Sequence, residues 1–223
     1  MYKNNVIMKD IILFDMDGTL FDTSEGITKC AQYALSKFGI QEKLEDLTCF
    51  IGPPLIEAFM ERYDFTRETA KKAVEIFRER YSTKGVYECS EIAGARECIT
   101  ALFNQNKTLC VATCKPEKFA NIILQRAGLS KYFDVVVGSE MDEKRTKKDE
   151  VIFEVFERLS EKNVKERCVM VGDREHDILG AKTCGIQSIG IKVGFAEEGE
   201  LEKAGANYIV NDFNELLSLL LKI

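Results

Sequence analysis

Six short apolar runs recur along this chain, and each is too short for a helix and rich in β-branched residues. They are predicted to be buried strands at residues 10–14, 108–112, 134–138, 168–172, 188–191 and 208–210. Segments of helical length lie between or after them, at residues 90–106, 115–128, 148–161, 177–185, 197–205 and 213–223. Strands that alternate with helices predict an α/β protein with a parallel sheet covered by helices on both faces.

One interval breaks this alternation, because no convincing strand occurs between Phe21 and about Tyr87. Its three predicted helices carry apolar residues at helical spacing and cover residues 24–39, 54–63 and 67–81. Thr66 stands where the third helix would begin and resembles an N-cap. We therefore expect an inserted, all-helical, lid-like cap domain at residues 22–87 and a core domain made of residues 1–21 and 88–223.

The composition excludes several classes of partner. The chain has 223 residues, of which 45% are hydrophobic and 30% charged, an ordinary globular mixture. Its net charge is -6 and no basic stripe occurs, so we expect no nucleic-acid partner. No apolar run has the length of a signal peptide or a membrane span, so we expect no membrane partner.

The cysteines argue against zinc fingers and thioredoxin-like sites. There are eight cysteines and one histidine, and no C-x-x-C pair occurs. Most of the cysteines lie in apolar stretches, where a thiol packs as a small hydrophobic side chain. We therefore expect reduced thiols and a cytoplasmic protein.

Polar side chains follow four of the predicted strands, at the point where each strand ends. Asp15, Asp17 and Gly18 follow the first strand, Thr113 follows the second, Lys147 and Lys148 follow the third, and Asp173 and Asp177 follow the fourth. Functional groups of open parallel sheets collect at this edge. Carboxylates that repel one another there can be held by a hard cation, and a lysine and a hydroxyl suit phosphate oxygens. The pattern predicts metal-assisted phosphoryl chemistry with an aspartate nucleophile.

Four motifs resemble those of the haloacid dehalogenase superfamily of phosphatases. They are DMDGTL at 15–20, VATCKP at 111–116, the lysine before DEVIFEVF, and VGDREHDILGA at 171–181. The resemblance spans nearly the whole chain and implies a Rossmann-like sheet with a helical cap after the first motif. FIGPPL at 50–55 resembles the cap of phosphoglycolate-phosphatase-like members.

The resemblance implies a role for each residue of the first two motifs. Asp15 would be the nucleophile that accepts the phosphoryl group. Asp17 would protonate the leaving oxygen and then activate water, and its backbone carbonyl would bind Mg²⁺. Thr113 and the backbone around Gly18 would bind the phosphoryl oxygens, with Cys114 beside them as a passive small side chain of the substrate pocket.

The later motifs would complete the site. Lys148 would neutralise charge between Asp15 and the phosphoryl group and contact the substrate. Asp173 would bind the metal directly, and Asp177 would do so through water or support the other ligands. The implied Mg²⁺ site therefore comprises Asp15, Asp17, Asp173 and Asp177.

Several of these residues also have simpler interpretations. Lys147 competes with Lys148 as the active lysine, although Lys148 fits the motif better. Thr113 could satisfy its own backbone at a strand end, and Asp177 could cap the following helix. His176 is expected to be a loop residue or a support rather than a metal ligand. The basic cluster KRTKK is expected to be a loop that delivers one lysine.

The preferred function is that of an enzyme, a Mg²⁺-dependent phosphoric monoester hydrolase similar to phosphoglycolate phosphatase, which acts on a small phosphorylated metabolite through an aspartyl-phosphate intermediate. Asp17 distinguishes the chain from dehalogenases, which lack this carboxylate, and from ion-pumping ATPases, which carry threonine there. A 5'-nucleotidase, a pyrophosphatase, a sugar phosphomutase and a non-catalytic binding module on the same fold remain as alternatives. The protein is expected to be a monomer or a homodimer.

Overall fold

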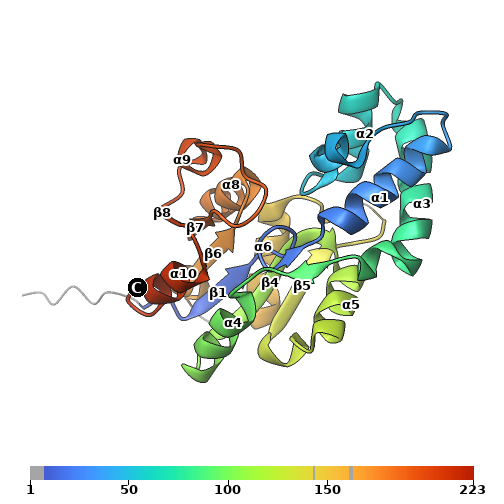
Figure 1. Cartoon of the computed structure of the whole chain (residues 1–223). Helices are drawn as coiled ribbons and strands as arrows, with labels where there is room; N and C mark the ends of the chain where they lie inside the picture. Colours follow the sequence, from blue (N-terminus) through green and yellow to red (C-terminus); the bar gives the residue numbers. More distant parts are fainter. Residues whose placement is uncertain (1–7, 143, 161–162) are drawn as a thin grey trace, which may run out of the picture. The chain divides into compact units, whose positions relative to one another are not determined.

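The computed structural model describes residues 8–142, 144–160 and 163–223 (Figure 1). The first seven residues of the predicted core domain and residue 161 of a predicted helix lie outside these ranges. The chain divides into two compact units, one comprising Met1–Leu20 and Glu91–Ile223 and the other Phe21–Ser90. The second unit thus begins one residue before the predicted insert at 22–87 and ends three residues after it. Its interpretation as a cap remains a proposal.

The first unit contains a six-stranded parallel sheet, and all six predicted strands belong to it. The strands are β1 (Ile11–Phe14), β4 (Thr108–Pro116), β5 (Val135–Ser139), β6 (Cys168–Gly172), β7 (Gln187–Ile191) and β8 (Tyr208–Val210). Their order is β5-β4-β1-β6-β7-β8, and every neighbouring pair is parallel. The predicted fold class is confirmed.

Both faces of the sheet are buried, which explains the continuous apolar runs in the sequence. Ile11 and Leu13 of β1 belong to a core cluster that includes Val151 and Val155. Successive side chains of a strand point to opposite faces, so Ile12 is directed to the other side of the sheet, where it is also fully buried.

Helices cover each face of this sheet (Figure 1). They are α4 (Ala95–Asn104), α5 (Glu117–Ala127), α6 (Lys148–Leu159), α7 (Val164–Arg167), α8 (Glu175–Cys184), α9 (Glu200–Ala204) and α10 (Phe213–Leu220), with the 3-10 turn η3 (Ser130–Tyr132). Helices α6 and α8 pack against each other, and α6 also contacts β4 and β5. Helix α7 and η3 were not predicted, because segments of three or four residues carry no periodicity.

The second unit is almost entirely helical. It contains α1 (Ser24–Ser36), α2 (Leu55–Tyr63) and α3 (Arg67–Thr83), together with the 3-10 turns η1 (Leu44–Phe50) and η2 (Gly85–Tyr87). The three predicted helices are confirmed, and the hydroxyl of Thr66 caps α3 by accepting the Thr69 N–H at 3.2 Å. An unpredicted two-stranded sheet pairs β2 (Phe21–Asp22) with β3 (Ser90–Glu91), at the points where the chain passes between the units.

Within the described residues, no helix combines the length and apolar character that crossing a membrane would require.

Helix α1 approaches the backbone of η2 closely, and Gly26 makes this approach possible. The Gly26 N–H donates to the Glu88 carbonyl at 3.0 Å, and a Cβ on Gly26 would lie 2.2 Å from the Gly85 carbonyl oxygen. Because that neighbour is backbone, it cannot move aside as a flexible side chain would.

We expect Gly26→Ala to lower the free energy of unfolding by about 1–3 kcal/mol, the usual cost of overpacking. Glu75→Ala, on the exposed face of α3, is the control and should change it by less than about 0.5 kcal/mol. Chemical denaturation of the three proteins measures both values. Equal stabilities of Gly26→Ala and the parent protein would contradict the close approach.

Candidate active site

The four sequence motifs meet beyond the carboxyl ends of β1, β4 and β6. Asp15 follows β1 directly, Thr113 lies near the end of β4, and Lys148 is the first residue of α6. Asp173 follows β6, and Asp177 lies in the first turn of α8. Six of the predicted residues with charged or hydroxyl side chains are buried: Asp15, Asp17, Thr113, Lys148, Asp173 and Asp177.

Lys148 connects these motifs through its ammonium group. Its Nζ lies 2.6 Å from Asp15 Oδ1, 2.8 Å from Asp177 Oδ1 and 2.9 Å from the Ala112 carbonyl oxygen. A lysine has three N–H donors, so these contacts can use all of them. Lys147 is exposed, and its backbone N–H donates to Glu150. Of the two candidate lysines, the structure therefore brings Lys148 to Asp15.

The packing of α6 on α8 gives the Lys148 side chain its route into the site. A Cβ on Gly180 of α8 would lie 2.6 Å from Lys148 Cγ and 2.7 Å from its Cβ. Glycine at this position therefore leaves the space through which the lysine stem passes.

The electrostatics of the site show an excess of negative charge. Burial, together with the nearby carboxylates of Asp177 and Asp17, raises the pKa of Asp15 to about 6, although Lys148 opposes the shift. Burial and the charges of Asp177 and Asp15 raise the pKa of Asp173 to about 8. Burial lowers the pKa of Lys148, but the neighbouring Asp15 and Asp177 carboxylates outweigh it and raise that pKa well above its ordinary value.

Asp173 is held in place by two donors that the sequence analysis did not identify. The Thr19 hydroxyl donates to Oδ1 at 2.8 Å, and the Phe195 N–H donates to Oδ2 at 2.8 Å. A Cβ on Gly18 would lie 2.3 Å from Asp173 Oδ2, and a Cβ on Gly194 would lie 2.1 Å from it. Thr19 belongs to the first motif, in which it has no assigned role, whereas Phe195 lies in a loop after β7 that carries no motif.

Asp177 does not cap α8 in the way that the sequence suggested. Arg174 occupies the N-cap position, and Asp177 is the third helical residue. Its Oδ2 accepts the Arg174 N–H at 3.1 Å while Oδ1 contacts Lys148. A Cβ on Gly172 would lie 2.1 Å from the Asp177 carboxyl carbon, so this approach requires glycine at the end of β6. Asp177 thus both stabilises the helix terminus and lies in the charged cluster.

A divalent cation fits the carboxylates at the centre of the site. One oxygen each from Asp15, Asp173 and Asp177 lies within 4.8 Å of the others, and all three side chains are buried. The donors are carboxylates only, and the pKa values of two of them are raised by burial first and by the neighbouring negative charges second. Oxygen donors with excess negative charge suit a hard cation such as Mg²⁺. His176 is not part of this group, and its buried Nε2 forms no hydrogen bond with the described residues.

The Asp17 carboxyl group contacts a different lysine, which the sequence analysis did not assign. Lys115 Nζ lies 2.8 Å from Asp17 Oδ1 and 3.0 Å from Oδ2. The Asp17 side chain is absent from the carboxylate group that could hold a metal, and metal binding by its backbone carbonyl remains a prediction. Lys115 lies two residues after Thr113 in the second motif, and that position was the available signal.

The remaining residues of the predicted phosphoryl pocket have local roles. The Thr113 hydroxyl accepts the Lys115 N–H at 3.2 Å, as the strand-end interpretation expects, and its contact with a phosphoryl group remains a prediction. Burial raises the pKa of the Cys114 thiol to about 12, and its role as a passive side chain remains a prediction. Gly18 adopts a left-handed φ of 86°, which turns the backbone after the aspartates.

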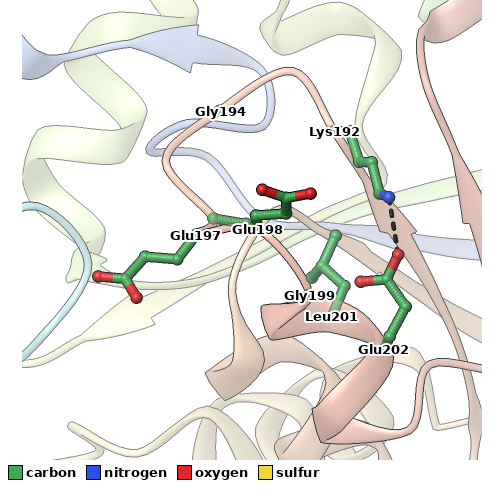
Figure 2. Close-up of a pocket in the computed structure, with 8 residues that line it drawn as sticks. Lys192, Gly194, Glu197, Glu198, Gly199, Leu201 and Glu202 are labelled. Carbon is green, nitrogen blue, oxygen red and sulfur yellow. Dashed lines mark hydrogen bonds and ion pairs between the residues drawn. The ribbon is translucent and has the colours of Figure 1, made fainter.

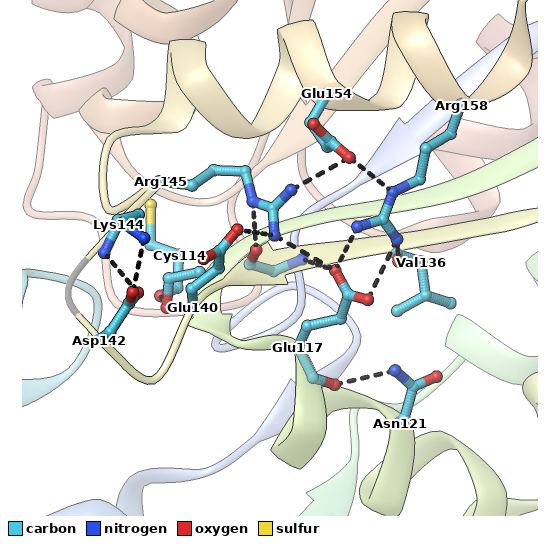
Figure 3. A network of polar contacts seen from close by, with 12 residues as sticks. Cys114, Glu117, Asn121, Val136, Glu140, Asp142, Lys144, Arg145, Glu154 and Arg158 are labelled. Carbon is cyan, nitrogen blue, oxygen red and sulfur yellow. Dashed lines mark hydrogen bonds and ion pairs between the residues drawn. The ribbon is translucent and has the colours of Figure 1, made fainter.

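A network of ion pairs holds the loop that precedes Lys148 (Figure 3). Arg145 Nε donates to the Gly138 carbonyl at 3.0 Å, and its guanidinium lies 3.1 Å from Glu154 and 3.2 Å from Glu140. The basic cluster therefore contains the residue that attaches the loop to the end of β5 and to α6.

A separate pocket of about 150 Å³ lies along the loop after β7 (Figure 2). Its lining includes Lys192, Gly194, Glu197, Glu198 and Glu202, and Lys192 pairs with Glu202 at 2.7 Å. None of the clustered carboxylates that could hold a metal lines it.

Known proteins resemble this chain in sequence and in structure. Residues 12–191 match the family of haloacid dehalogenase-like hydrolases. A 5'-nucleotidase of Pseudomonas aeruginosa is 42% identical over 210 residues, which cover 94% of each chain. A phosphoglycolate phosphatase of Vibrio parahaemolyticus is 26% identical over 218 residues, covering 94% of this chain and 95% of the relative. The crystal structure of a predicted phosphatase from Clostridium acetobutylicum, 42% identical, superposes with a TM-score of 0.93 over 97% of this chain and 100% of that one.

The raised carboxyl pKa values predict how Mg²⁺ affects stability at different pH. Between the ordinary value of 3.8 and about 8, the folded metal-free protein binds more protons at Asp173 than the unfolded chain does. The contribution of Asp173 to the free energy of unfolding therefore falls as pH rises through that window. The contribution of Asp15 falls in the same way up to about pH 6. Because Mg²⁺ replaces these protons, it should raise the melting temperature more near pH 8 than near pH 5.

Thermal unfolding with EDTA or with Mg²⁺ at both pH values measures this effect. Asp173→Asn removes one titrating ligand and should reduce the difference between the two pH values. An equal Mg²⁺ effect at both pH values would contradict the assignment of these carboxylates as metal ligands.

Proposed function

The chain belongs to the haloacid dehalogenase-like hydrolase family, and we propose that it is a Mg²⁺-dependent phosphatase that hydrolyses a small phosphorylated metabolite through an aspartyl-phosphate intermediate. The observation that carries the proposal is the contact of Lys148 with Asp15 and Asp177, beside the group of carboxylates that could hold a cation. An oriented carboxylate next to a fixed positive charge suits attack on a phosphorus atom.

In the first step, the Asp15 carboxylate forms a bond to phosphorus as the bond from phosphorus to the substrate oxygen breaks. Asp17 donates a proton to that leaving oxygen, so a neutral alcohol departs. In the second step, Asp17 accepts a proton from water, and the resulting hydroxide attacks the phosphorus. The bond to Asp15 then breaks, which releases inorganic phosphate and restores the carboxylate.

The other residues hold the phosphoryl group and balance its charge. Lys148 neutralises charge between Asp15 and the phosphoryl oxygens, and the Thr113 hydroxyl and the backbone at Gly18 donate hydrogen bonds to them. Asp15, Asp173 and Asp177, with the Asp17 backbone carbonyl, would hold Mg²⁺, which supplies positive charge against the phosphoryl oxygens.

A nucleoside 5'-monophosphate is the first candidate substrate. The support is the name of the Pseudomonas relative, whose identity of 42% exceeds the 26% of the phosphoglycolate phosphatase. The sequence motifs alone favour phosphoglycolate instead. Pyrophosphate, and a sugar phosphate if the protein is a mutase, remain as alternative substrates. None of the eight cysteines, all of which lie within the described residues, forms a disulfide bond, which supports a reducing, cytoplasmic location.

A substrate panel with Mg²⁺ tests the proposal. We expect phosphate release from nucleoside 5'-monophosphates to exceed that from phosphoglycolate, pyrophosphate and hexose phosphates, and we expect EDTA or Asp15→Asn to abolish it. Isomerised sugar phosphate without net phosphate release would identify a mutase. No turnover of any phosphate ester by the Mg²⁺-loaded protein would favour the binding module and overturn the proposal.

The two aspartates should differ in the step that each one limits. With an activated aryl phosphate, whose leaving group needs little protonation, Asp17→Asn should still form the phosphoenzyme but hydrolyse it more slowly, since acid–base help is worth about 10²–10⁴ in rate. Intact-protein mass spectrometry after a rapid acid quench should then show one added phosphoryl group on the peptide that contains Asp15. Asp15→Asn should show none. A label on Thr113 or Cys114 would make the nucleophile assignment wrong.

A further inference from the structure

The ion pair between Lys115 and Asp17 joins the second motif to the first inside the site. Both side chains are largely removed from solvent, with 4% of Lys115 and 11% of Asp17 exposed. The ammonium contacts both carboxylate oxygens at 2.8 and 3.0 Å, which limits rotation of the carboxyl group as well as neutralising it.

A bulge in β4 directs Lys115 to this position. Ala112 is paired with Val137 and Pro116 with Ser139, so three residues of β4 lie opposite Gly138 alone. A bulge of this kind changes the direction of a side chain at a strand end.

Neighbouring groups fix the bulge in place. A Cβ on Gly138 would lie 2.4 Å from the Lys115 carbonyl oxygen, so the bulged backbone needs glycine there. The Ser139 hydroxyl donates to the Cys114 carbonyl at 2.8 Å, and the Lys115 N–H donates to Thr113 Oγ1 at 3.2 Å. The backbone that carries Lys115 is therefore held on both sides.

The site thus gives each of its two neighbouring aspartates a separate lysine. Lys148 contacts Asp15 and Asp177, whereas Lys115 contacts Asp17. The same division appears in the carboxylate group that could hold a metal, which includes Asp15 and omits the Asp17 side chain. Without Lys115, the buried Asp17 carboxylate would lose the positive charge that contacts both of its oxygens.

We propose that Lys115 is a positioning residue for proton transfer, because it keeps the Asp17 carboxyl group apart from the Asp15–Asp173–Asp177 group and directed at the leaving oxygen and the attacking water. This inference rests on the proposed function of Asp17 as general acid and base. Lys115 itself transfers no proton, and its effect on the reaction passes through Asp17.

The test compares Lys115→Met with Asp17→Asn and with the control Lys147→Met, which changes an exposed lysine. The kcat of each variant is measured with phosphate monoesters whose leaving groups range from acidic phenols to alcohols. The kcat of Lys115→Met should fall about tenfold or more with alcohol leaving groups. This loss is a part of the roughly 10²–10⁴-fold rate increase that general acid–base catalysis supplies. The kcat of this variant should change little with the most acidic phenol as leaving group, and Lys147→Met should have the kcat of the parent protein with every substrate.

A second readout does not depend on turnover. After a rapid acid quench with the activated aryl phosphate, Lys115→Met should accumulate phosphoenzyme on Asp15, as Asp17→Asn does, because the water-activating step is slowed. Adding Lys115→Met to Asp17→Asn should cause little further loss, since both changes act on one group. Lys115→Arg keeps the charge and should recover part of the rate, and melting temperatures show that each variant is folded.

Four results would overturn the inference. The first is an equal loss of kcat in Lys115→Met for all leaving groups, and the second is a raised KM confined to substrates with a second anionic group. The third is a double variant whose loss of kcat equals the combined losses of Lys115→Met and Asp17→Asn. The fourth is a Lys115→Met variant with the same kcat as the parent protein. The raised KM would make Lys115 a substrate-binding residue instead. If Asp17→Asn itself shows no dependence on the leaving group, the proposed role of Asp17 fails, and the inference fails with it.

Discussion

The buried ammonium group of Lys148 is the interaction on which the arrangement of the site depends. It links the end of β1 at Asp15, the backbone of β4 at Ala112 and the first turn of α8 at Asp177. A charge this deeply buried is tolerable only when it is paired and hydrogen-bonded, so the three segments must meet at this point. The packing of α6 on α8 and the absence of a side chain at Gly180 follow from the same requirement, because the lysine stem passes between the helices.

Most of the fold could be predicted from the sequence. The central strands β1 and β6 are fully buried, so each is a continuous apolar run, and the helices of the insert have clear periodicity. The short elements β2, β3, α7 and η3 were missed because a few residues contain no repeat that could be recognised.

The candidate site was predicted less evenly. Asp15, Asp173 and Asp177 come together as expected, since each follows a strand or begins a helix at one edge of the sheet. The role of Lys115 was not predicted, because its partner Asp17 lies 98 residues away and because the bulge that directs it depends on a glycine and a serine of the neighbouring strand. Phe195 was missed because it contributes a backbone N–H, which any residue except proline could supply.

The short ribbon of β2 and β3 has a consequence for how this chain could have arisen. The strands at which the chain leaves the first unit and returns to it, β2 and β3, are hydrogen-bonded neighbours, so the two ends of the intervening segment lie close together. The intervening segment is therefore an insertion whose length can change without altering the strand order of the sheet. Over evolutionary time, such a segment can be exchanged or enlarged while the carboxylates and their lysines keep their positions, so the two units can diverge at different rates.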